Sequence, residues 1–176
     1  MSGFRNKTRQ AARRVTAGLP ALAMTAALAF PLPALAYEVV EESDERVIYS
    51  VEGDFDHYFE MVEFAIETEG LVINNVGHIA DMLDRTAGQE SGEGIYLNGR
   101  SVDFCSATYS RATMEADPHN ITFCPYVIAI YELSAEPGTI YMSYQRVPQI
   151  GDEASQESLG DVNDLVDRIV TEALMF

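Results

Sequence analysis

Cys105 and Cys124 carry the most distinctive chemistry of the sequence, because the chain has only two cysteines. Three interpretations are open. An oxidising compartment and the even number favour a disulfide. A reactive thiol is the second interpretation, since Cys105 is expected just before a helix, whose N-terminus lowers a thiol pKa. The third is simple burial, a common state of cysteine.

The same segment offers a candidate metal site made of Cys105, Met114, His119 and Cys124. Thiolate, thioether and imidazole are soft or borderline donors, and such a set suits copper(I) better than calcium or magnesium. The site requires reduced cysteines, so it competes with the disulfide. The two other histidines, His57 and His78, are interpreted as surface or hydrogen-bonded residues.

Four tyrosines, Tyr126, Tyr131, Tyr141 and Tyr144, fall on two expected strands of one hairpin. Tyrosine on a sheet usually packs with its hydroxyl hydrogen-bonded. The alternative is that these rings line an apolar pocket between sheet and helices. They are therefore the candidate pocket residues.

Motifs for common catalytic sites are missing from the sequence. The segment 88–92 has the wrong spacing for a nucleophile elbow, and no phosphate-binding loop, Cys-x-x-Cys or His-Glu-x-x-His is present. No catalytic residue is therefore assigned, and no pair stands out among the many carboxylates.

Residues 1–36 have the order of a secretory signal peptide. Five basic residues precede an apolar stretch, and Ala34-Leu35-Ala36 fits the small-residue rule for cleavage. The apolar run is shorter than the roughly 20 residues that span a bilayer, which argues against an anchor. We expect cleavage after Ala36, a periplasmic or secreted protein, and no transmembrane segment in the processed chain.

The chain is strongly acidic, with 28 acidic and 11 basic residues and a net charge of −17. Removal of residues 1–36 would leave six arginines, no lysine and a net charge of −22. Such a chain repels phosphate backbones, so nucleic acid is an unexpected partner. Dense negative charge also suggests a saline environment, or simply an acidic secreted protein.

Hydrophobic periodicity predicts an acidic leader at 37–45 and a single α+β domain at 46–176. Glycine-rich residues 87–94 predict a loop. Strands are expected at 47–51, 71–73, 101–105, 121–133 and 139–147, and helices at 55–66, 79–83, 106–116 and 162–174. We expect a two-layer sandwich with helices on one face of a largely antiparallel sheet.

The segment from Cys105 to Tyr126, with Tyr131-Glu132 downstream and 69–72 upstream, resembles the family called domain of unknown function 302. The resemblance covers roughly residues 45–150. It implies a compact α+β domain and no established activity. Two positions depart from the family pattern: Ala107 replaces a frequent proline, and Cys124 precedes Pro125 instead of following it. The resemblance therefore assigns no role to Cys124.

The leading functional hypothesis is an exported, non-catalytic binding protein for a small ligand, a metal or a partner protein. It follows from the missing catalytic motifs and from a sheet-and-helix sandwich able to form a pocket. The alternative is a thiol-dependent redox protein that uses Cys105 and Cys124.

Overall fold

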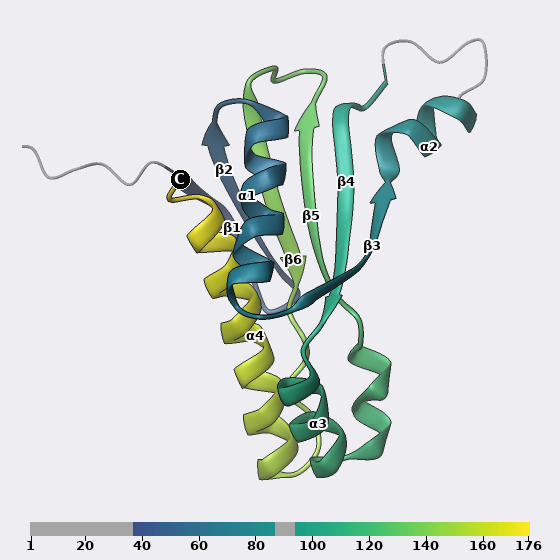
Figure 1. The fold of residues 1–176 in the computed structure, drawn as a ribbon, viewed down its shortest axis with the longest axis vertical. Coiled ribbons are helices and arrows are strands. Elements are labelled where there is room, and N and C mark those ends of the chain that lie inside the picture. Colours follow the sequence, from purple (N-terminus) through teal and green to yellow (C-terminus); the bar gives the residue numbers. More distant parts are fainter. Residues whose placement is uncertain (1–36, 87–93) are drawn as a thin grey trace, which may run out of the picture. The chain divides into compact units, whose positions relative to one another are not determined.

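The computed structural model describes residues 37–86 and 94–176. The expected signal peptide and most of the expected glycine-rich loop lie outside these residues. The elements are, in chain order, β1 (Tyr37–Glu42), β2 (Arg46–Glu52), α1 (Phe55–Thr68), β3 (Val72–His78), α2 (Ile79–Thr86), β4 (Tyr96–Cys105), α3 (Ala107–Ala116), the 3₁₀ helix η1 (Pro118–Phe123), β5 (Tyr126–Leu133), β6 (Thr139–Gln145) and α4 (Glu153–Ala173) (Figure 1).

The six strands form one sheet in the order β1-β2-β6-β5-β4-β3, and every neighbouring pair is antiparallel. Helices α1 and α4 pack against each other and cover one face of this sheet (Figure 1). This arrangement confirms the expected α+β class. Within the described residues, no helix combines the length and apolar character needed to cross a bilayer.

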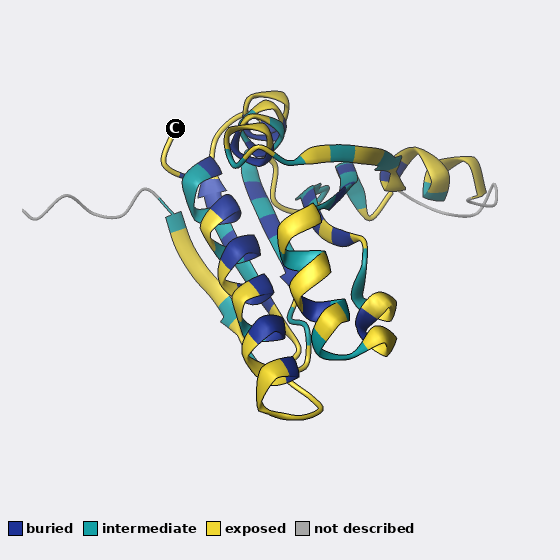
Figure 2. Ribbon diagram, turned by 60° about the horizontal axis from the view of Figure 1, so that its bottom comes forward, coloured by how far each residue is buried: buried dark blue, intermediate teal, exposed yellow. Residues whose placement is uncertain are grey.

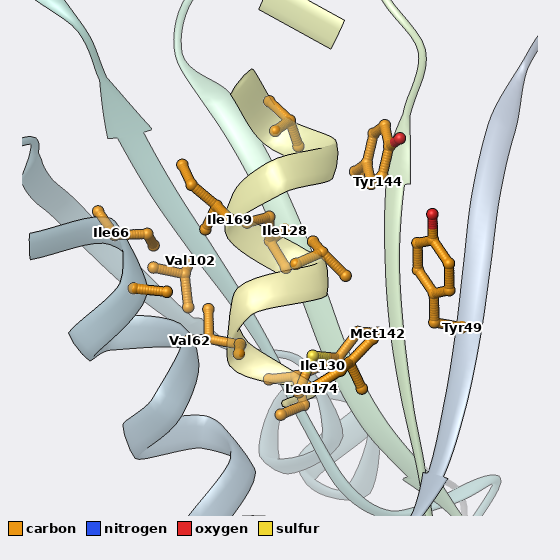
Figure 3. Packing of buried hydrophobic residues seen from close by; sticks show 14 of the residues in the cluster. Tyr49, Val62, Ile66, Val102, Ile128, Ile130, Met142, Tyr144, Ile169 and Leu174 are labelled. Carbon is orange, nitrogen blue, oxygen red and sulfur yellow. The ribbon is translucent and has the colours of Figure 1, made fainter. Parts of the chain in front are cut away.

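The core lies between the sheet and helices α1 and α4. Alternate residues of each central strand point toward the helices, as Val47, Tyr49 and Val51 do on β2. Helix α4 contributes a buried stripe that repeats at helical spacing, and this stripe is visible as dark blue along one side of the helix (Figure 2). Ile128, Met142 and their neighbours from the sheet meet that stripe (Figure 3).

One carboxylate sits at the margin of this core. Tyr49 on β2 and Tyr144 on β6 stand side by side (Figure 3). Both donate hydrogen bonds to Oδ1 of Asp167 on α4, at 2.6 and 2.7 Å. Burial and the adjacent carboxylate raise the pKa of both phenols. The contact fixes α4 to two strands of the sheet.

Short polar side chains determine where helices α1 and α3 begin. Asp54 accepts a hydrogen bond from the backbone N–H of His57 at 3.0 Å and caps α1. Ser106 accepts from Tyr109 in the same way at the start of α3. Gly70 follows α1 with φ of 73°, a conformation in which glycine is favoured.

Four expectations on local structure are wrong. The helix expected at 162–174 begins at Glu153, because Asp152 caps it there. Residues 37–42, expected to be loose, form edge strand β1, in which acidic side chains remain in solvent. Strand β3 continues through Asn74-Asn75, because a bulge between Ile73 and Asn75 accommodates them. The expected strand 121–133 starts only at Tyr126, because Pro118 and the Asp117 cap begin η1.

Candidate functional site

Cys105 and Cys124 meet at the end of the sheet where β4 stops and β5 starts. Cys105 is the last residue of β4, and Cys124 follows η1 just before β5. The two strands are neighbours, with Phe104 opposite Tyr126. Their Sγ atoms lie 2.8 Å apart, and both residues are free thiols in the structure. The topology therefore brings the two cysteines together.

The hydroxyl groups of Ser110 and Tyr126 lie near this thiol pair. The Ser110 hydroxyl lies 3.7 Å from Cys124 Sγ and 3.4 Å from the Tyr126 hydroxyl. Burial raises the pKa of the Cys105 thiol to about 11, and the contact with Cys124 adds to the shift. Burial likewise raises the pKa of Tyr126. The pKa of the Cys105 thiol is thus raised, opposite to the lowering expected from its position before α3.

The candidate copper ligands are not all brought together. Met114 is half-buried on α3, and His119 is exposed on η1. Across residues 37–86 and 94–176, no group of three His, Cys, Asp or Glu side chains is placed to hold a metal. His119 therefore does not join the two thiols in such a group, because its helical turn presents it to solvent.

The four candidate pocket tyrosines divide between the two faces of the sheet. Tyr126 and Tyr144 are buried on the face that the helices cover. Tyr131 and Tyr141 are partly exposed on the other face, where their rings stack with centroids 5.1 Å apart. Tyr141 also donates a hydrogen bond to Glu136. Since side chains alternate along a strand, the four rings do not line one pocket.

A cleft opens beside the thiol pair, where β5 and β6 separate. Their pairing ends at Ile128 and Tyr144. Beyond that point β5 stays with β4, whereas Gln145 of β6 stays opposite Arg46 of β2. The split leaves a cleft of about 580 Å³. Pro125, Tyr126 and Val127 line one side of it, Gln145, Arg146 and Pro148 line the other, and Val166 of α4 contributes as well.

The cleft continues toward the uncovered face of the sheet. A second hollow of about 250 Å³ shares Arg46, Ala129 and Ser143 with it and reaches Tyr131. Ala129 and Ser143 are opposite each other on β5 and β6, so their small side chains leave this space open. Tyr126 and Tyr144 line the cleft, and Tyr131 lines only the second hollow.

Sequence reasoning missed the cleft, although a signal for it was present. Pro125 and Pro148 flank the hairpin at the same end. Proline has no backbone N–H and cannot extend a ladder, so the two prolines mark where the strands stop pairing. The pattern predicts the ends of the strands but not the direction in which they separate.

Comparisons with known proteins agree with this fold. The model of the family described as domain of unknown function DUF302 matches residues 47–174. A crystal structure of an uncharacterised conserved DUF302 protein from Bacillus stearothermophilus has the same fold, with a TM-score of 0.58 and 15% identity over 72% of this chain and 97% of that chain. No curated protein matches the chain. Because the family model covers most of the sequence, the chain belongs to the DUF302 family.

Proposed function

We propose that this protein is an exported domain that binds a small ligand in the cleft between β5 and β6 and does not transform it. The cleft carries the proposal. Its volume of about 580 Å³ lies within the range of small-molecule sites, roughly 300–1,000 Å³. Apolar walls such as Phe123 and Pro148 alternate with hydroxyl, amide and guanidinium groups, a combination that binds and orients a ligand.

The walls of the cleft are supported by ordered elements on both sides. Val147 donates its backbone N–H to Asn163 Oδ1 at 2.7 Å, and Asn163 Nδ2 donates back to the Val147 carbonyl at 2.9 Å. On the other side, Tyr126 is fixed by its core packing and by Ser110. A cleft with such walls keeps its form before a ligand arrives, which reduces the entropy lost on binding.

Native mass spectrometry of the protein, isolated without denaturation from the periplasm of its own cells, tests the proposal. We expect a bound small molecule. Ala129→Phe should abolish its retention, because Ala129 lines both hollows and a phenyl ring would fill them. Ser50→Phe is the matched control, since Ser50 lies on β2, on the far side of β6 from Ala129, and outside the cleft lining. Equal retention by both variants would refute the cleft as the site.

Export is part of the same proposal and rests on the composition of residues 1–36. The intact mass of the protein recovered outside the cytoplasm should correspond to a chain that begins at Tyr37. A mass that includes residues 1–36 would instead indicate a retained N-terminal segment, and the exported soluble form would be rejected.

The thiol pair supports a second candidate function, that of a redox protein. The Sγ separation of 2.8 Å suits conversion of two thiols to a disulfide, with both electrons passing to an external disulfide that is reduced to two thiols. The raised pKa of Cys105 makes it a slow nucleophile near neutral pH, which favours a stable cross-link over turnover. The rate at which the reduced protein reduces oxidised glutathione distinguishes a stable cross-link from redox turnover, with the Cys105→Ser variant as the control. Rapid, repeated exchange by the wild type would favour the redox function.

A further inference from the structure

The cleft differs in charge from the rest of the chain. Of the 28 acidic residues in the sequence, none lines the cleft, whereas Arg46 and Arg146 both do. These are two of the six basic residues that remain after residues 1–36 are removed. A random patch of so acidic a chain would contain carboxylates, so the residue types indicate a site that tolerates or attracts negative charge.

Both arginines are held in place by carboxylates of β1 that do not themselves line the cleft. Arg46 donates from Nε and Nη2 to Glu41, at 2.9 and 2.7 Å. Arg146 donates from Nη2 to Glu42 at 2.8 Å. A guanidinium group has five N–H donors, so these pairs leave three donors of Arg46 and four of Arg146 for other acceptors.

The carboxylates also limit what the site can bind. Each ion pair offsets the charge of its arginine, so simple attraction of any anion would be weak. The remaining donors are directional, and planar oxyanions such as carboxylates fit the fork of a guanidinium group. Thr122 and Ser143 add hydroxyl groups to the lining, while Phe123, Pro125 and Val127 offer apolar contact.

We propose that the cleft binds an organic carboxylate, with its charged end at Arg146 and its apolar body against the β5 side. The inference rests on the proposed function and specifies the ligand class. Arg46 lies toward the opposite face of the sheet, because it pairs with Gln145 and Arg146 is the next residue. Arg146 is therefore the determinant, and its side chain is 28% exposed, against 57% for Arg46, so its hydrogen bonds are less screened by solvent.

Calorimetric titration with 2-naphthoate and its neutral counterpart 2-naphthamide, at constant ionic strength, tests the inference. We expect the processed protein to bind the carboxylate at least tenfold more tightly than the amide, as charge-assisted hydrogen bonds predict. Arg146→Gln should remove this preference, and Arg111→Gln should keep it. Arg111 is the matched control, an exposed arginine on α3 that also pairs with a glutamate.

Glu42→Gln separates recognition from a structural effect. It frees the Arg146 guanidinium from its carboxylate partner, so we expect tighter naphthoate binding, opposite to the effect of Arg146→Gln. The double variant Glu42→Gln, Arg146→Gln leaves no unpaired carboxylate. It replaces Arg146→Gln in the titrations if the single variant fails to fold.

Two results would overturn the inference in distinguishable ways. Equal affinity for naphthoate and naphthamide, unchanged by Arg146→Gln but abolished by Ala129→Phe, would reject the anion while retaining the cleft as a binding site. Failure of both probes to bind, or binding that Ala129→Phe does not change, would reject the cleft and with it the proposed function.

Discussion

The thiol pair gives the most quantitative prediction, a disulfide between Cys105 and Cys124 that stabilises the exported protein. Their Sγ atoms are 2.8 Å apart, and Cys105 closes β4 while Cys124 precedes β5. The cross-link would therefore form with little change in either strand. It would close a loop that contains α3 and η1.

The size of the effect follows from the loop length. The closed loop has about 20 residues, and the chain-entropy model gives roughly 3 kcal/mol for a loop of that size. Unfolding of a domain of about 140 residues has an entropy of roughly 0.3 kcal/mol/K. Oxidation should therefore raise Tm by about 10 °C.

Two measurements check this prediction. Thiol counting after denaturation, on protein isolated without reductant, should find no free thiol. Thermal unfolding should then show a Tm about 10 °C lower once dithiothreitol is added. The double variant Cys105→Ser, Cys124→Ser is the control, and its Tm should not respond to dithiothreitol. Two free thiols in the isolated protein, or equal Tm values with and without reductant, would refute the reasoning.

Three further predictions concern the charged and polar contacts. In urea titrations, Tyr49→Phe and Tyr144→Phe should each lower the free energy of unfolding by about 1–2 kcal/mol, because each removes a hydrogen bond to the Asp167 carboxylate. Tyr141→Phe removes a hydrogen bond to the exposed Glu136 and should lower it by less than about 0.5 kcal/mol. Equal losses for all three variants would contradict this prediction. Arg168 lowers the pKa of Glu69, so the stability that this pair contributes is present above the ordinary pKa of 4.5 and is lost as the pH falls below it. The Tm difference between wild type and Arg168→Gln should accordingly be larger at pH 7 than at pH 3, and a constant difference would count against the pair. Finally, Tm should rise between low salt and about 0.5 M sodium chloride, where the Debye length is about 4 Å, because salt screens the repulsion of a chain with net charge −22; a flat or falling Tm would exclude repulsion as a limit on stability.

The sequence predicts elements whose side chains repeat on one face or carry a capping residue. Helix α1 begins at Phe55 as expected, with Asp54 as its cap, and it runs two residues beyond the expected end at 66 before Gly70. Strand β1 was missed because its acidic residues resemble a solvated tail, and only its pairing with β2 makes it a strand. Propensity is weak at such an edge, and tertiary contact decides the conformation.

The sequence indicates which residues lie on neighbouring strands better than it indicates which face of the sheet they occupy. Cys105 and Cys124 meet because β4 and β5 are adjacent and antiparallel. The tyrosines are split, since Tyr126 and Tyr131 lie an odd number of residues apart on one strand and so face opposite sides. Their shared hairpin was visible in the sequence, and this odd spacing alone would have excluded a common pocket.

Segment 122–126 connects the thiol pair to the cleft, and this connection constrains both proposals. Cys124 lies between Phe123 and Pro125, which line the cleft. A disulfide at Cys124 would fix this wall to the end of β4 and so reduce the motion that a ligand must otherwise suppress. Loss of the disulfide should therefore weaken ligand binding without removing any group that touches the ligand. If the disulfide forms and the cleft binds the carboxylate, the naphthoate affinity of the wild type should depend on oxidation. The affinity of the double serine variant should not depend on it. Neither the disulfide nor the binding cleft produces this result alone.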